Sequence, residues 1–197
     1  MIFESLELIA QELNKYLNSI DNQDDDLVTL GNIAFFESNF PGSQESNTLL
    51  DKIVITLINL EEEATLKNMS SNKIINDRTE YLNPPINLNL YILISSTSSS
   101  YDNSLKYLSR VVTFFQDKKV FTEQNSPTNN LPEISMDSFK FILDQYSPTF
   151  EESNFLWSTL GGKQLPSVIY KMRLLKLESD KKIEVRGVIE NIEINKK

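Results

Sequence analysis

The amino-acid sequence predicts an α/β or α+β fold, with a single mixed β-sheet flanked by helices. The predicted elements follow the order helix, strand, strand, strand, helix, strand, helix, strand, which is typical of helices packed on one sheet. Residues 52–60 carry apolar side chains on both faces, as expected of a strand covered on both sides. The chain has 197 residues and 40% hydrophobic side chains, which is enough for a buried core.

The first predicted element is an amphipathic helix over residues 2–20. Its apolar side chains recur at steps of four and three residues, which places them on one stripe: Ile2, Leu6, Ile9, Leu13, Tyr16 and Ile20. Acidic Glu4 and Glu7 in this segment argue against a secretory signal peptide. An acidic loop over residues 21–26 ends the helix, and a strand is expected over residues 27–35.

The middle of the chain predicts two strands separated by a loop. Residues 52–60 form the expected central strand. Residues 65–83 are polar and rich in Asn, and we expect a long exposed loop there. Pro84 and Pro85 favour an extended backbone, after which apolar side chains alternate along a second strand: Ile86, Leu88, Leu90, Ile92 and Ile94.

The serine-rich stretch 95–100 precedes a second helix, expected over residues 101–117. Its predicted buried side chains are Leu105, Leu108, Val111, Val112 and Phe115. Ser99 and Asp102 have the spacing of a capping box, in which two side chains satisfy free backbone N–H groups at a helix start. A polar loop is expected over residues 123–132.

The next strand has an irregular pattern. Ile134 and Met136 share one parity, whereas three further apolar side chains share the other: Phe139, Phe141 and Leu143. This predicts either a bulge near Asp137 or imperfect pairing.

A short helix and a strand follow. Thr149 and Glu152 form a second capping-box pattern, and Gly161 and Gly162 are expected to end the helix. The helix offers four large apolar side chains for packing: Phe150, Leu156, Trp157 and Leu160. Trp157 is either a packing residue or a recognition aromatic. Pro166 then opens a strand that runs to about Leu177.

The last segment predicts a C-terminal β arm. The polar hinge 179–182 precedes a strand over residues 182–194, with a bulge at Gly187 that reconciles two phases of apolar side chains. We therefore expect one domain over residues 1–178 and an arm over 179–197. The candidate partner-binding residues of the arm are Ile183, Val185, Arg186, Val188, Ile192 and Ile194. The arm is either an edge strand protected by Lys or a strand that adds to a partner's sheet.

The sequence contains no His and no Cys. These absences exclude a Ser-His-Asp triad, a thiol nucleophile and metal sites that need either residue. Glu61–Glu63 are either a solvated strand end or carboxylates for a divalent cation. Asp24–Asp26 lack the pattern of a calcium loop, and Gly161–Lys163 lack that of a phosphate loop. We predict no catalytic residue, no metal site and no cofactor.

The charge and hydropathy patterns exclude two further partner classes. The formal net charge is −9, whereas nucleic-acid binding needs a clustered surplus of Lys and Arg. The longest apolar run, Ile53–Ile58, is far too short to cross a bilayer. We therefore expect a soluble protein that is synthesised in the cytoplasm, binds no nucleic acid and does not insert stably into membranes.

Several segments, taken in order, resemble the tail-terminator or cap protein family of contractile injection systems, the phage-tail-like particles. The residues that carry this resemblance are Leu60–Glu63, Asn68, Pro84, Pro85, Leu88, Leu90, Tyr91, Leu93, Leu156, Trp157, Ser158, Pro166, Ser167 and Tyr170. The resemblance runs from the N-terminal helix to about Leu177. Residues 65–83 and those after Asp180 show no clear family pattern.

The resemblance implies a structural function and an α/β terminator domain. Six copies would form a ring on the distal end of the tail, contact the inner tube and sheath proteins and stop their polymerisation. No enzymatic activity is implied. The protein would become part of the assembled particle after synthesis, with release outside the cell in some systems.

Two alternative functions stay open at this point. One is a tail-completion or assembly factor that binds tube or sheath subunits without remaining as a cap. The other, from a different class, is a carboxylate-dependent hydrolase that uses Glu61–Glu63 with a divalent cation.

Overall fold

The computed structural model describes eight segments of the chain: residues 1–21, 26–36, 49–63, 72–75, 78–82, 86–126, 139–177 and 182–187. Its contacts group the chain into two units. The first unit comprises Met1–Glu61 and Asn89–Leu175, and the second comprises Glu62–Leu88 and Lys176–Lys197.

A six-stranded mixed sheet forms the centre of the first unit, with the order β1-β2-β5-β8-β7-β6. Its strands are β1 (Val28–Leu30), β2 (Ile53–Glu62), β5 (Ile86–Ser96), β6 (Val120–Thr122), β7 (Lys140–Tyr146) and β8 (Ser167–Leu177). β1 runs parallel to β2, whereas β7 runs antiparallel to both β6 and β8. The predicted mixed sheet is therefore confirmed.

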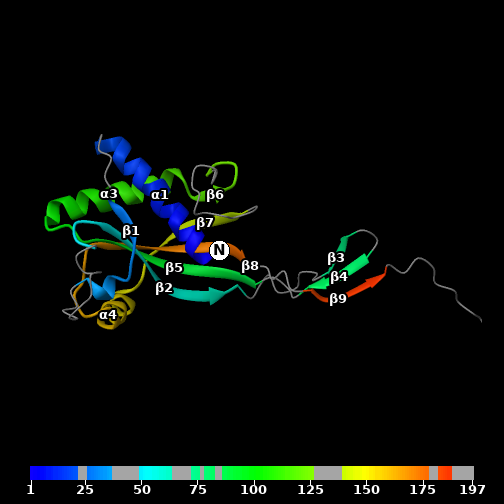
Figure 1. Cartoon of the computed structure of the whole chain (residues 1–197). Coiled ribbons are helices and arrows are strands. Elements are labelled where there is room, and N and C mark those ends of the chain that lie inside the picture. The colour runs from blue at the N-terminus through cyan, green and yellow to red at the C-terminus, as the bar shows by residue number, and fades with distance from the viewer. Residues whose placement is uncertain are drawn as a thin grey trace, which may run out of the picture. The chain divides into compact units, whose positions relative to one another are not determined.

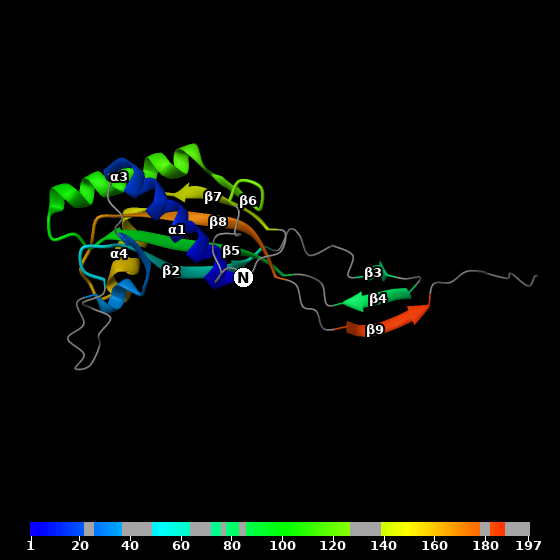
Figure 2. The same ribbon diagram turned by 45° about the horizontal axis from the view of Figure 1, so that its top comes forward.

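Helices α1 (Ile2–Asp21) and α3 (Tyr101–Asp117) lie on one face of this sheet (Figures 1 and 2). The first and last residues of both helices agree with the predicted ones to within one residue. Ring contacts join α3 to the sheet, since Phe115 lies 4.5 Å from Tyr170 between ring centroids. Asp21 of α1 pairs with Arg110 of α3, and Glu12 of α1 pairs with Lys118, the C-cap of α3. Because these pairs are partly exposed, each adds little to stability.

Helix α4 (Phe150–Thr159) lies on the opposite face of the sheet (Figure 1). Its buried residue Trp157 belongs to a cluster of buried side chains: Ile33, Leu49, Val54, Leu93, Trp157 and Ile169. Alternation along β5 and β8 explains the division between the faces, because neighbouring residues of a strand point to opposite sides. Thus Ile169 packs near Trp157, whereas Tyr170 packs near Phe115.

The strand expected over residues 27–35 is shorter than predicted. It ends at Leu30, and residues Ile33–Phe35 form a short 3₁₀ helix, η1. The side chain of Asn32 accepts a hydrogen bond from the Ala34 N–H, 3.1 Å away. Thr56 Oγ1 accepts a bond from the Ile33 N–H at 3.2 Å and donates one to the Gly31 carbonyl at 2.6 Å. These bonds to side chains replace the strand pairing that a longer β1 would make.

The strand expected at residues 52–60 is covered on both faces only in its first half. Residues 53–56 are buried, but Leu57 is 38% exposed and Leu60 45% exposed. The predicted coverage is therefore wrong for the second half, where β1 also no longer pairs with β2. Apolar side chains on both faces of a strand do not show how far other elements cover it.

The second predicted helix has a different buried face and a different N-terminus from those expected. Leu105 is 45% exposed, whereas Phe114, absent from the predicted set, is 6% exposed. The predicted capping box is also wrong. Ser100 is the N-cap and makes no side-chain cap bond, and the Ser99 N–H donates to Asp51 Oδ1 at 2.7 Å. A residue 48 positions away therefore takes the N–H that local capping would leave free.

The strand after the second polar loop is confirmed as β7, with Phe139, Phe141 and Leu143 all buried. The short edge strand β6 is not among the predicted elements. Ile134, Met136 and Asp137 lie outside the described residues, so the expected bulge stays a prediction.

The second unit contains a separate three-stranded antiparallel sheet, with the order β3-β4-β9. Its strands are β3 (Asn72–Ile75), β4 (Arg78–Leu82) and β9 (Lys182–Gly187). The prediction of one long loop over residues 65–83 is wrong for the residues of β3 and β4. The polar composition of this segment gives no sign of strands, because these strands belong to a separate small sheet and not to the large core.

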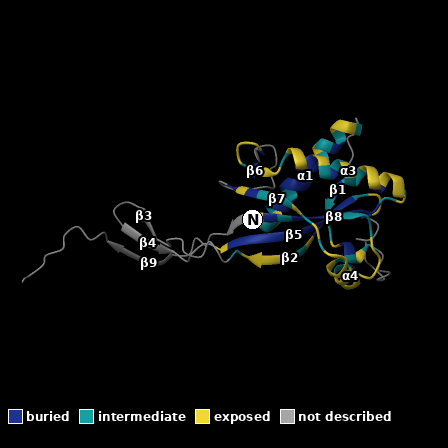
Figure 3. Cartoon of the chain, turned by 180° about the vertical axis from the view of Figure 1, so that it is seen from behind, coloured by how far each residue is buried: buried dark blue, intermediate teal, exposed yellow. Residues whose placement is uncertain are grey.

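No described helix has an apolar stretch of the length that a bilayer crossing requires. Among the described residues, most of the buried ones lie in the strands of the six-stranded sheet, and β5 is dark blue along most of its length in Figure 3.

Candidate interaction surfaces

The N-terminus of α4 is built by the capping box that the sequence predicts. The Thr149 hydroxyl accepts a hydrogen bond from the Glu152 N–H at 3.2 Å, and Glu152 Oε2 accepts one from the Thr149 N–H at 2.8 Å. The helix therefore begins at Phe150, and its first turn carries the carboxylates of Glu151 and Glu152. Negative charge at this end interacts favourably with the helix dipole and so stabilises the helix.

The C-terminus of α4 is closed by the predicted glycine pair. Gly161 and Gly162 have φ values of 111° and 85°, a region that favours glycine. The Gly162 N–H donates to the Trp157 carbonyl at 2.7 Å. The chain thereby turns back toward β8, so Lys163 and Leu165 lie beside η1. Gly161–Lys163 are thus a helix end, as expected.

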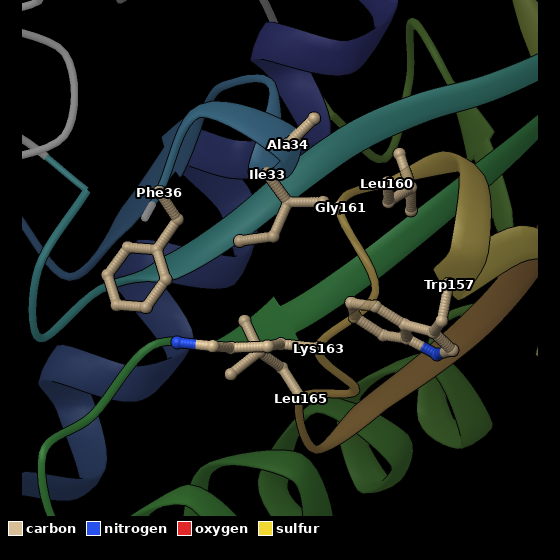
Figure 4. A pocket seen from close by; sticks show the side chains of 8 residues that line it. All are labelled: Ile33, Ala34, Phe36, Trp157, Leu160, Gly161, Lys163 and Leu165. Carbon is tan, nitrogen blue, oxygen red and sulfur yellow. The ribbon is translucent and has the colours of Figure 1, made fainter. Parts of the chain in front are cut away.

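An apolar groove of about 310 Å³ lies between η1 and the end of α4 (Figure 4). We call it the α4 groove, and it is lined by Ile33, Ala34, Phe36, Trp157, Leu160, Gly161, Lys163 and Leu165. Ile33 and Trp157 also belong to the buried cluster beneath, so the floor of the groove is continuous with the core. Lys163 is the one charged residue among the eight, and in Figure 4 its side chain extends toward Phe36.

Large aromatic side chains are exposed on α4 itself. Phe150 is 98% exposed and Phe155 is 63% exposed. The expectation that Phe150 packs is wrong, because nothing among the described residues covers it. Trp157, by contrast, is 8% exposed and packs in the core. Phe150 is the most exposed large apolar side chain among the described residues.

A polar network lies on the same sheet face as α4. The Tyr91 hydroxyl donates to Glu61 Oε2 at 2.9 Å, and Lys171 Nζ donates to the same oxygen at 3.2 Å. The Lys171 amine also lies 4.9 Å from the centre of the Tyr91 ring. The hydrogen bond with Tyr91 raises the pKa of Lys171, and the hydrogen bond with Glu61 raises it further. This network joins β2, β5 and β8.

The network continues toward α4 through a second tyrosine. The rings of Tyr91 and Tyr146 meet edge to face, with centroids 5.4 Å apart. The Tyr146 hydroxyl donates to Glu152 Oε1 at 3.4 Å, and the negative charge of Glu152 raises the pKa of Tyr146. Glu152 therefore caps α4 and also holds the end of β7 against it.

The Glu61–Glu63 segment is the sequence's candidate for carboxylate chemistry. Glu61 lies near the end of β2, and its carboxylate accepts hydrogen bonds from Tyr91 and Lys171. These bonds give the carboxylate a structural role. Among the described residues, no group of three or more acidic, His or Cys side chains is placed to hold a metal ion.

The candidate arm residues fall in two groups. Ile183, Val185 and Arg186 lie in β9, which pairs with β4 through Val185 opposite Glu80 and Arg186 opposite Thr79. Val188, Ile192 and Ile194 lie outside the described residues. β9 is the last strand in the order β3-β4-β9, so its second edge has no neighbouring strand in the described part of the chain.

Comparison of the sequence with protein-family models identifies the family of this chain. It matches the Pvc16 N-terminal domain family over residues 6–191, nearly the whole chain. The chain belongs to the Pvc16 N-terminal domain family. The resemblance to terminator and cap proteins that the sequence indicated is thereby confirmed. Among curated proteins, no sequence matches the chain.

Two solved structures have a similar fold. The sheath/tube terminator of PVC, an extracellular contractile injection system, in its extended state matches with a TM-score of 0.63 and 14% identity, over 100% of this chain. The tube-terminating cap of the anti-feeding prophage matches with a TM-score of 0.54 and 14% identity, over 95% of this chain. The matches cover 63% and 60% of those two proteins. This chain therefore shares its fold with part of each of these two proteins.

Proposed function

We propose that this protein is a structural cap of a contractile injection system, which binds the distal end of the inner tube and sheath and stops their growth. The observation that carries the proposal is the Pvc16 N-terminal domain match over residues 6–191. The two similar structures, a sheath/tube terminator and a tube-terminating cap, support the same function. The protein acts without catalysis, is made in the cytoplasm and then joins the particle.

A terminator must solve a geometric problem. A tube or sheath grows because each layer exposes a surface that accepts the next copy, and such contacts do not close on themselves. A cap has to satisfy that surface once without offering it again on the outside. Six copies in a ring would match a tail of six-fold symmetry and occupy all growth sites of the last layer together.

The second unit supplies a means of binding, through the arm residues Ile183, Val185 and Arg186 of β9 and the following Val188, Ile192 and Ile194. β9 pairs with β4 on one edge, and an extended segment of a tube or sheath subunit would pair with the other. Main-chain hydrogen bonds give such pairing affinity without requiring a particular partner sequence. This fits a surface that meets several identical subunits.

Electron microscopy of particles from a strain that lacks this protein tests the proposal. We expect overlong or ragged tails, and we expect the full chain to restore normal length when it is supplied again. Normal tail lengths in the deletion strain would overturn the cap function. Labelling of the protein on finished particles separates a cap from an assembly factor, because only a cap remains at the tail end.

Two truncations test the arm. A chain that ends after Gly187 keeps β9, whereas a chain that ends after Asp180 lacks it. We expect the longer chain to bind particle ends more weakly than the full chain, because it lacks Val188, Ile192 and Ile194, and the shorter chain to fold but not to bind. Normal capping by the shorter chain would reject β9 as the binding strand and leave the cap function itself intact.

A further inference from the structure

Helix α4 carries an apolar projection that none of the described residues covers. Phe150, Ser153, Trp157 and Leu160 follow one another at steps of three, four and three residues, so they form one stripe of the helix. The stripe packs on the sheet at Trp157, but at Phe150 the side chain is 98% exposed. An aromatic ring this exposed gains free energy when a partner covers it.

The same molecule also offers an apolar depression of matching chemistry. The α4 groove is about 310 Å³ in volume, and its walls are formed by aromatic and aliphatic side chains such as Phe36, Leu160 and Leu165. Phe150 cannot fill the groove of its own chain. Leu160 lies ten residues after Phe150, a separation of about 15 Å along a helix whose axis is rigid.

The charges beside the two features are complementary. Glu151 follows Phe150 directly and is exposed, whereas Lys163 lies at the rim of the α4 groove. When the ring of one chain enters the groove of another, the carboxylate and the amine come within reach of each other. Opposite charges around an apolar contact fix its orientation more than they add to its strength.

We propose that Phe150 of one copy docks in the α4 groove of the next copy, with Glu151 facing Lys163. The contact is heterologous, because the projection and the groove are different surfaces. Repetition of one heterologous contact closes into a ring when its rotation closes. This inference rests on the proposed cap function for its biological setting, and it assigns the residues through which neighbouring copies of the cap touch.

Cysteine cross-linking tests the contact cleanly, because the chain contains no native Cys. One sample carries Glu151→Cys, a second carries Lys163→Cys, and the two are mixed in equal amounts under mild oxidation. We expect covalent dimers in the mixture and almost none in either sample alone. A mixture of Glu151→Cys with Lys119→Cys is the matched control, since Lys119 is exposed and lies two residues after the end of α3.

Two alanine substitutions on α4 separate docking from general stickiness. Phe150→Ala in the Glu151→Cys chain should lower the cross-linked yield by about tenfold, as for an interface residue that supplies much of the contact. Phe155→Ala should leave the yield unchanged, because Phe155 points about 140° around the helix from Phe150. Both side chains are exposed, so neither substitution should change the melting temperature.

The outcomes distinguish this inference from the cap function. The cross-linking is done both on free protein and on particles that carry the cap. Absence of the mixed dimer in both settings, or equal dimers in the Glu151→Cys sample alone, overturns the contact between copies. Cross-links that persist in Phe150→Ala indicate another occupant of the groove and also overturn it. Tail lengths in the deletion strain test the cap function independently of all these results.

Discussion

At the scale of single residues, aromatic side chains divide sharply between the core and the surface of the described chain. Trp157 and Phe155 lie two positions apart on α4, yet one is 8% exposed and the other 63%. On the opposite face of the sheet, Phe115, Phe121 and Tyr170 are buried almost completely. Burial, not residue type, therefore decides what each aromatic side chain contributes to stability.

Replacement of Trp157 by Ala should destabilise the protein strongly. The substitution leaves a cavity among Leu93, Val54 and Ile169, and such changes cost about 3–5 kcal/mol. Phe155→Ala on the same helix should change the free energy of unfolding by less than about 0.5 kcal/mol. Urea denaturation of both variants measures the difference. Equal effects would show that Trp157 does not pack as the structure describes.

The burial of Tyr170 leads us to predict a loss of stability at alkaline pH. Burial raises the pKa of its phenol to about 12, whereas the unfolded chain ionises it near pH ~10. The unfolded state then binds fewer protons than the folded state, so stability falls as the pH rises. The contribution is complete below pH ~10 and is lost through pH ~12, a change of about 2–3 kcal/mol.

The measurement is a comparison, because other Tyr and Lys side chains titrate in the same range. Denaturation of the native chain and of Tyr170→Phe is followed at several pH values between neutral and strongly alkaline. The difference between the two free energies of unfolding should change in the predicted window. A constant difference would mean that the Tyr170 phenol is ionised as readily in the folded state as in the unfolded one.

At the scale of elements, the two helices that follow strands begin in different ways. Helix α4 has a complete capping box, which needs only residues within its first turn. Ser100 is the N-cap of helix α3, but its side chain makes no cap bond. The carboxylate of Asp51, which is distant in sequence, accepts a hydrogen bond from the nearby Ser99 N–H. The first helix start is a local property and the second is a tertiary one.

This difference predicts unequal effects of two Ser or Thr substitutions. Thr149→Ala removes the hydroxyl that accepts from Glu152 N–H and should cost about 1 kcal/mol. Ser100→Ala removes no cap bond and should change the free energy of unfolding by a few tenths of a kcal/mol at most. Thermal melts of both variants check this order, and a larger loss for Ser100→Ala would contradict it.

At the scale of the whole molecule, the chain divides into two units that each have their own sheet. The chain passes from one unit to the other after Glu61, after Leu88 and after Leu175. The second unit is therefore an insertion between β2 and β5 combined with the segment after β8. Such a division suggests that the six-stranded sheet and its helices contain the information for their own folding.

Excision of the second unit tests this independence. β2 and β5 are antiparallel at their ends, because the Glu63 N–H donates to the Asn87 carbonyl at 2.8 Å and the Thr97 N–H donates to the Lys52 carbonyl at 2.9 Å. An Asn-Gly turn in place of residues 64–86 should therefore join Glu63 to Asn87 as a two-residue hairpin. The shortened chain ends after Leu177.

We expect this shortened chain to fold, with cooperative unfolding and a near-ultraviolet circular dichroism spectrum close to that of the full chain. It should no longer bind particle ends, because it lacks β9. A chain that remains unfolded would show that the first unit depends on the second. A folded chain that still binds would move the binding surface to the first unit.

Local patterns of side chains encode the parts of this protein that depend on neighbouring residues. Periodicity predicts α1, α3 and β5, and the Thr149–Glu152 pattern with Gly161 and Gly162 places both ends of α4. The family resemblance also comes from the sequence, because ordered motifs survive where overall identity is low. The absence of His and Cys excludes whole classes of enzyme on composition alone.

The covered surfaces of these elements, by contrast, are set by tertiary contacts. Such contacts end β1 at Leu30, leave Phe150 and Leu105 exposed, and pair β4 with β9 across about a hundred residues of sequence. The α4 groove arises because η1 and the turn after α4 meet, although they are far apart in the chain. Burial and pairing depend on contacts between distant segments, and no local pattern of side chains encodes where those contacts stop.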